Sequence, residues 1–180
     1  MKLKLCLSAI VIISFLWNNA AAFDNAIVNK KIGFAITLPD NIQEKSDSTA
    51  DGPEVSYYDP HSDVYLIISE RSSKFERVED YMDCSKKDLE KQLRYFADDS
   101  TLQLINCVKS SYYPGESVIL HFKTQTAPYG LNGNFIYFLH HNDRDIQLTF
   151  MYNTANQKTS MDYIDVVMQT FKLLDKKNRR

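Results

Sequence analysis

The sequence is poor in the residue types and spacings that carry most enzyme chemistry. Its 180 residues include three cysteines, four histidines and one tryptophan. It contains no G-x-S-x-G, H-E-x-x-H, C-x-x-C or Walker A pattern, so the usual signatures of serine hydrolases, zinc peptidases, dithiol oxidoreductases and P-loop nucleotide-binding proteins are missing. We therefore predict a protein that is not an enzyme and has no catalytic residue, bound metal or cofactor.

The sequence also lacks an excess of positive charge. It has 21 basic and 23 acidic residues, for a net charge of −2. A general nucleic-acid-binding protein needs a basic face, and the one basic cluster here is the short C-terminal tail, residues 175–180. A tail of this kind is usually solvated, so we predict that nucleic acid is not a partner.

No apolar run is long enough to cross a membrane. The longest, residues 5–17, has 13 residues, whereas a spanning helix needs about 20. Lys2 and Lys4 precede the run and Ala20 and Ala22 follow it, which is the pattern of a signal peptide. We expect cleavage after Ala22, with a retained anchor as the alternative. Residues 23–180 would then form a single domain that is periplasmic or secreted.

Removal of residues 1–22 would leave two cysteines, Cys84 and Cys107. An exported protein with an even number of cysteines usually oxidises them. We therefore expect a structural disulfide between Cys84 and Cys107. Metal ligation and a nucleophilic thiol are the alternatives, but the sequence offers neither suitably spaced ligands nor a neighbouring base.

Glycine and proline, five of each, lie between apolar runs and mark turns. The runs predict strands over residues 32–39, 63–70, 102–109, 117–124, 134–141 and 145–152, whereas the polar segment 44–54 is predicted to be a loop. Helical spacing occurs over 78–96, and again from an N-cap at Thr159 or Ser160 to Phe171. The order of strands, helix, four-strand meander and helix predicts an α+β domain with a mostly antiparallel sheet flanked by two main helices.

Three segments resemble the PsbP-like family. "IGFAITLPDNIQ" is similar to the opening hairpin of that family. "VYLIISERSSKFERVEDYMDCSKKDLEKQL" is similar to its strand and following helix, and "YIDVVMQTFKLL" to its closing helix. The resemblance spans residues 26–174 and implies a PsbP-like sandwich. The family is used for binding and assembly and shares no catalytic motif, so the resemblance also implies a non-enzymatic role.

Two loops carry apolar residues that suit a binding surface. Tyr112 and Tyr113 lie at one turn, and Tyr129 and Leu131 lie in a segment bounded by glycine and proline. Because exposed tyrosines are common interface anchors, we predict that these four residues bind another protein, in the envelope or exported. The role would be that of an accessory factor: an assembly or chaperone-like factor, or an inhibitor or immunity protein. The alternative is that Tyr112 or Tyr113 folds back over the sheet.

Two other classes of function remain open. A small metal-dependent hydrolase would use His61, between Asp59 and Asp63, or would use His140 or His141 with a nearby aspartate. The more ordinary interpretation of both regions is polar turn chemistry. A small-ligand carrier would need a pocket between helix and sheet. His121 lies in the middle of a predicted strand, facing away from its apolar neighbours, and is expected to be a half-buried structural histidine.

Overall fold

The computed structural model describes residues 25–39, 41–45, 53–71, 81, 83–97, 100–109, 116–125, 130–140 and 144–174. The strands are β1 (Asn25–Asn29), β2 (Phe34–Leu38), β3 (Gln43–Lys45), β4 (Glu54–Asp59), β5 (Val64–Arg71), β6 (Gln103–Lys109), β7 (Glu116–Lys123), β8 (Gly133–His140), β9 (Asp145–Tyr152) and β10 (Lys172–Leu173). The helices are α3 (Lys86–Ala97), the 3₁₀ turn η3 (Thr154–Asn156) and α4 (Gln157–Thr170).

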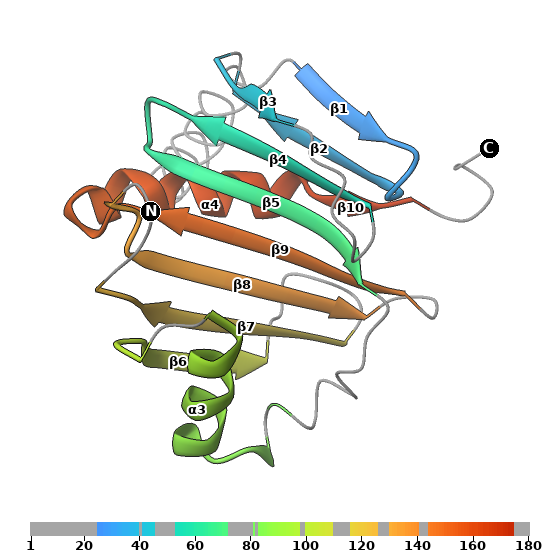
Figure 1. Cartoon of the computed structure of the whole chain (residues 1–180). Coiled ribbons are helices and arrows are strands. Elements are labelled where there is room, and N and C mark those ends of the chain that lie inside the picture. The colour runs from blue at the N-terminus through green and yellow to red at the C-terminus, as the bar shows by residue number, and fades with distance from the viewer. Residues whose placement is uncertain are drawn as a thin grey trace, which may run out of the picture.

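Most strands belong to one antiparallel sheet. Its order is β3-β4-β5-β9-β8-β7-β6, and a smaller sheet has the order β1-β2-β10 (Figure 1). Strands β6 to β9 follow one another as a meander. Strand β5 pairs with β9, the last strand of the meander. The chain therefore passes through α3 from β5, inside the large sheet, to β6 at its edge. The predicted α+β class and the four-strand meander are both confirmed.

The two faces of the large sheet are covered by different elements. On one face, Leu148 and Phe150 of β9 pack with α4 and with the small sheet, whose Phe34 stacks on Phe171 at 5.8 Å between ring centroids. On the other face, a second hydrophobic cluster joins the apolar side chains of β7 to α3. Its buried members are Leu89, Leu93, Leu102, Leu104, Val118, Leu120 and Phe122. Because side chains alternate along a strand, α3 and α4 lie on opposite faces of the sheet.

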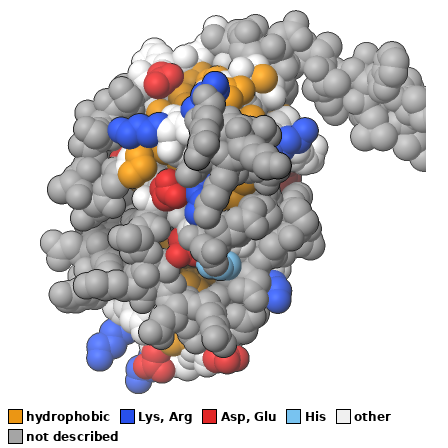
Figure 2. Space-filling view, turned by 90° about the vertical axis from the view of Figure 1, so that its right-hand side faces the viewer, with side chains coloured by type: hydrophobic (Ala, Val, Ile, Leu, Met, Phe, Trp, Pro, Cys, Tyr) orange, Lys and Arg blue, Asp and Glu red, His pale blue; other side chains and the backbone are white. Residues whose placement is uncertain are grey.

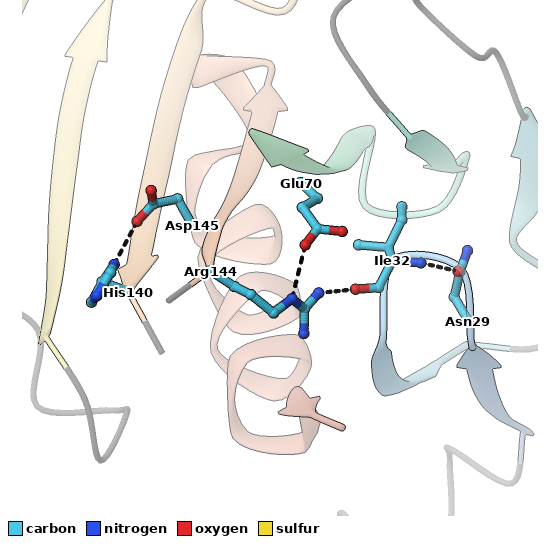
Figure 3. Close-up of polar contacts among 6 residues, drawn as sticks. All are labelled: Asn29, Ile32, Glu70, His140, Arg144 and Asp145. Atoms are coloured by element: carbon cyan, nitrogen blue, oxygen red, sulfur yellow. Dashed lines mark hydrogen bonds and ion pairs between the residues drawn. The ribbon is translucent and has the colours of Figure 1, made fainter. Parts of the chain in front are cut away.

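A buried arginine connects the two sheets (Figure 3). The Arg144 side chain is 9% exposed, and its Nε donates to a Glu70 carboxylate oxygen at 2.8 Å. A second guanidinium nitrogen, Nη2, donates to the backbone carbonyl of Ile32, in the turn between β1 and β2. Asn29 supports the same turn by accepting the Ile32 N–H at 2.9 Å. The start of β9, the end of β5 and the small sheet therefore share one set of charge-assisted hydrogen bonds.

The first predicted helix is shorter than the helical spacing suggested. Tyr81 and Asp83 are helical, but the helix is interrupted at Cys84 and Ser85, and α3 begins at Lys86. Ser85 caps it: the hydroxyl accepts the Asp88 N–H at 3.2 Å and donates to the Asp88 carboxylate. Such a cap satisfies N–H groups that a helix start leaves unpaired. The prediction of one helix over 78–96 was therefore wrong at Cys84 and Ser85, where the helix is interrupted.

The second helix also begins earlier than predicted. Asn153 accepts the Ala155 N–H and starts the 3₁₀ turn that leads into α4 at Gln157. Ser160 is fully buried inside the helix, where its hydroxyl donates to the carbonyls of Ser62 and Asn156. The predicted N-cap at Thr159 or Ser160 was therefore wrong, because Ser160 holds α4 against the turn before β5 instead.

Candidate functional site

A pocket of about 230 Å³ lies between α3 and the edge strand β6. Its lining residues are Tyr81, Cys84, Lys86, Leu89, Leu104, Ile105, Asn106 and Cys107. The apolar floor comes from the cluster under α3, to which both cysteines contribute as half-buried neighbours. The break before the Ser85 cap places Cys84 at the rim, whereas Cys107 projects from the sheet toward α3.

A β-bulge decides which β6 residues face the pocket. Leu104 pairs with Phe122 and Cys107 pairs with Leu120, and the register shifts between Leu104 and Asn106. Both partners on β7 face α3, so Leu104 and Cys107 do too, although an uninterrupted strand would place them on opposite faces. The extra residue, Ile105, lines the pocket and is 42% exposed.

Side chains of α3 occupy backbone groups at the start of β6. The Glu90 carboxylate accepts the Leu104 N–H at 2.8 Å, and the Arg94 Nε donates to the Leu102 carbonyl at 2.8 Å. An edge strand presents backbone groups that can pair with another chain. The α3 side chains therefore cover those groups at the N-terminal end of β6.

Exposed apolar residues gather on this same strand. Three large hydrophobic residues are exposed within the described part of the chain: Val28 at 55%, Ile105 at 42% and Val108 at 39%. Two of the three, Ile105 and Val108, belong to β6. We call these two residues, together with the adjoining pocket, the β6 surface.

The loop residues predicted to bind a partner are placed only in part. Tyr112, Tyr113 and Tyr129 lie outside the described residues. Leu131 is described, and its side chain is only 5% exposed. An exposed position for Leu131 is therefore wrong, because it packs inward at the start of β8. A role in binding stays a prediction for the three tyrosines.

The two cysteines carry free thiols in this structure and are not joined. Burial, reinforced by the neighbouring Cys84, raises the pKa of the Cys107 thiol above its ordinary value. A raised pKa lowers the fraction of thiolate at neutral pH, and the thiolate is the nucleophile. The environment of Cys107 is therefore unlike that of an activated catalytic cysteine.

The Asp59–His61 region is a hydrogen-bonded turn. The Asp59 carboxylate accepts the N–H groups of His61 and Ser62 and the Ser62 hydroxyl, and Tyr58 donates to Asp63. These contacts engage both oxygens of Asp59 in local turn structure. Within the residues that the structure describes, no group of three or more histidine, cysteine or acidic side chains is positioned to hold a metal ion.

His140 forms the pair with an aspartate that the sequence allowed. Its Nδ1 lies 2.7 Å from an Asp145 carboxylate oxygen, across the β8–β9 ladder (Figure 3). Both side chains are partly exposed, and neither lines the pocket beside α3. Opposite charges on neighbouring strands commonly stabilise a hairpin. His141 lies outside the described residues.

His121 is the half-buried structural histidine that the sequence predicted. Its ring stacks on Phe135 at 3.9 Å between centroids, and its Nε2 lies 3.0 Å from the Tyr152 hydroxyl. Burial, with a smaller contribution from Lys123, lowers the pKa of His121 from 6.5 to about 4. The folded protein therefore keeps this ring neutral at pH values where the unfolded chain would protonate it.

We expect His121 to destabilise the protein in acid. Its pKa is lower in the folded state, so its stability contribution is complete above pH 6.5 and is lost as the pH falls toward about 4. The difference in melting temperature between wild type and His121→Gln should shrink over that range, as followed by circular dichroism. His140→Gln, at an exposed pair, is the control. Parallel curves for wild type and His121→Gln would contradict the expectation.

Charged residues of both signs are mixed on the surface. On the face drawn in Figure 2, the lysine and arginine side chains are interspersed with acidic ones among the described residues. Attraction of a nucleic acid depends on a block of positive charge, and this face offers a mixture of both signs instead.

Over the described ranges, no helix is both long and apolar enough to span a membrane.

The fold belongs to a known class, although the sequence matches no protein-family model and no curated protein. It is the Mog1/PsbP-like α+β fold. The solution structure of cyanobacterial PsbP (CyanoP) from Synechocystis sp. PCC 6803 is similar with a TM-score of 0.61 and 16% identity, over 84% of this chain and 93% of that one. The Ran-binding protein Mog1p of Saccharomyces cerevisiae is similar with a TM-score of 0.55 and 5% identity, over 85% and 96%. The PsbP-like fold predicted from the sequence is confirmed.

Sequence reasoning did not identify the β6 surface. Strict alternation along "LQLINCVK" puts Val108 on the same face as Leu104, where it would be buried. The bulge turns Val108 to the opposite face from Leu104 and Cys107. One available signal was the break in apolar alternation at Ile105, which follows Leu104 directly.

Proposed function

We propose that the protein is an exported, non-enzymatic accessory factor that binds another protein through the β6 surface. The observation that carries the proposal is the presence of Ile105 and Val108, both exposed, on the edge strand of the large sheet. Ile105 borders the pocket on the α3 side and Val108 lies on the opposite face of β6, so a segment paired to the free edge of this strand would contact both.

The position of these residues favours an extended segment of the partner as the ligand. A segment added beside an edge strand forms backbone hydrogen bonds, and its alternate side chains enter neighbouring pockets. The pocket beside α3 adjoins Ile105 and could receive one such side chain. Lys86 at the pocket and Lys109 at the end of β6 favour acidic residues flanking an apolar one in the partner.

Two features argue against the other classes of function. Small-ligand sites usually measure about 300–1,000 Å³, and the pocket beside α3, at about 230 Å³, lies below that range. Both oxygens of Asp59, beside His61, are engaged in a turn, and neither His140 nor Asp145, which form an exposed cross-strand pair, lines the pocket beside α3. The fold also includes Mog1p, described as a Ran-binding protein, which supports the use of this architecture for binding proteins.

The proposal is tested by affinity capture from the native cell envelope with Ile105→Ser/Val108→Ser as the variant. A stoichiometric partner should be captured by the wild type and reduced at least about tenfold in the variant, since hot-spot residues each contribute more than about 1 kcal/mol. Val28→Ser is the matched control, because Val28 is equally apolar and more exposed but lies on the small sheet. Equal loss in the control, or no loss in the variant, would refute the β6 surface.

The loop tyrosines provide a second arm of the same experiment. The variant Tyr112→Ala/Tyr113→Ala/Tyr129→Ala should weaken capture if the partner also contacts the loops. If this variant loses capture while Ile105→Ser/Val108→Ser keeps it in full, the binding site is assigned to the loops and not to β6. Circular dichroism of every variant should match the wild type, so that a loss of binding is not a loss of fold.

A further inference from the structure

The two free thiols line the same pocket beside α3. Cys107 projects from β6 on the face that α3 covers, as its pairing with Leu120 requires. Cys84 lies in the two-residue interruption before α3, outside the regular hydrogen bonding of the helix. Both line the same small pocket and pack against the same apolar cluster. A thiol on a short irregular segment can move toward a thiol fixed on a strand with little rearrangement.

Among the described residues, neither thiol makes a strong competing contact. The Cys107 Sγ lies 3.9 Å from the Tyr81 carbonyl oxygen, and the Gln92 side-chain nitrogen lies 4.0 Å from the Cys84 Sγ. These distances are at the outer limit even for sulfur, and thiols are weak donors and acceptors. Little hydrogen-bond energy would therefore be lost if the two sulfurs approached each other.

We propose that Cys84 and Cys107 form an intramolecular disulfide across this pocket, which fastens the start of α3 to the edge strand. Each thiol loses one proton and one electron as the S–S bond forms. The acceptor is a disulfide of a small thiol or of an oxidase, which is reduced to two thiols in the same exchange. The inference does not depend on the binding role proposed for the β6 surface.

The closed loop would contain all of α3. In the unfolded chain, joining the two cysteines removes the conformational freedom of the roughly two dozen residues between them. In the folded protein, the bond would hold Cys84 at the pocket that Tyr81 and Ile105 also line. The oxidised form should therefore melt at a higher temperature and show slower amide exchange around Ser85 than the reduced form. Because burial raises the pKa of Cys107, oxidation should become faster as the pH is raised.

The test uses the full chain carrying Cys6→Ser, so that Cys84 and Cys107 are its only cysteines. After incubation with oxidised glutathione, we expect an intact mass lower by two hydrogen atoms, no alkylation of the denatured protein, and a proteolytic fragment linking Cys84 to Cys107. The melting temperature should be higher by roughly 5–10 °C and should return to its lower value with reductant. Cys84→Ser and Cys107→Ser should lose the response to reductant.

Three results would overturn the inference. The first is full alkylation of both thiols after oxidation. The second is a disulfide that forms only between two copies of the chain, seen on a non-reducing gel. The third is a stable mixed disulfide with glutathione on either cysteine. The oxidised and reduced forms compared are of one sequence, the Cys6→Ser chain, so a folding defect in Cys84→Ser or Cys107→Ser cannot decide the outcome.

Discussion

Replacing Arg144 with methionine is expected to lower the free energy of unfolding by about 2–4 kcal/mol, because a half-buried charge pair loses one partner. The substitution keeps the length and apolar stem of the side chain but removes the guanidinium. The Glu70 carboxylate then loses its ion pair, and the Ile32 carbonyl in the turn of the small sheet loses a donor. Urea denaturation followed by circular dichroism measures the effect.

The exposed pair at the end of the neighbouring hairpin provides a control for Arg144. His140 and Asp145 are 46% and 32% exposed, whereas Arg144 is 9% exposed. His140→Ala should therefore cost at most about 1 kcal/mol, as exposed ion pairs usually do. If Arg144→Met and His140→Ala had the same effect, the connection between the sheets would contribute no more than a surface pair.

The second large effect is expected at Gly133, at the start of β8. The ring of the fully buried Tyr152 lies over this glycine, and a Cβ there would sit well inside van der Waals distance of three ring carbons. Gly133→Ala must therefore displace the ring or the strand, at a cost of about 2–3 kcal/mol. Displacement of the ring would also break the contact between its hydroxyl and His121, which nitrogen-15 NMR of the imidazole would detect.

Gly130 separates this steric effect from backbone strain. It has a φ of +73°, but a Cβ at this position would meet no atom within 4 Å. Gly130→Ala should cost only about 1 kcal/mol, the usual penalty for a left-handed alanine. A thermodynamic cycle of Gly133→Ala with Tyr152→Leu should be strongly non-additive, since the smaller side chain makes room for the methyl group. Additivity would mean that the two residues do not clash.

The sequence predicted the fold where its periodicity was simple. The four strands of the meander alternate regularly over most of their length, and their connections are hairpins, so order and pairing followed directly. The spacing of Ile164, Met168 and Phe171 identified α4, all three being buried. Its first turn was misplaced because Asn153, not Thr159 or Ser160, is the capping residue of this region. A helix cap depends on the backbone conformation of the residues that enter the helix. The spacing of apolar residues within the helix does not reveal that conformation.

The candidate site was harder to predict because it depends on a departure from periodicity. The apolar stripe through Tyr81 and Leu89 predicted one helix, although Ser85 and Asp88 form a cap between them. On β6, a single bulge after Leu104 reverses which side chains face α3. Both irregularities meet at one pocket. Cys84 and Cys107 line that pocket together, and the disulfide expected between them from the sequence stays a prediction.

The pairing of β5 with β9 has a consequence for how the molecule responds to cutting. These two strands form the middle of the large sheet, yet they come from the first and last parts of the described chain. A fragment ending before Asp145 would therefore leave β5 with a bare edge and an uncovered apolar row at Val64, Leu66 and Ile68. A fragment lacking the first strands would expose the matching side of β9. The two halves cannot be separated as smaller stable units, so proteolysis at the centre should release two insoluble pieces rather than a trimmed domain.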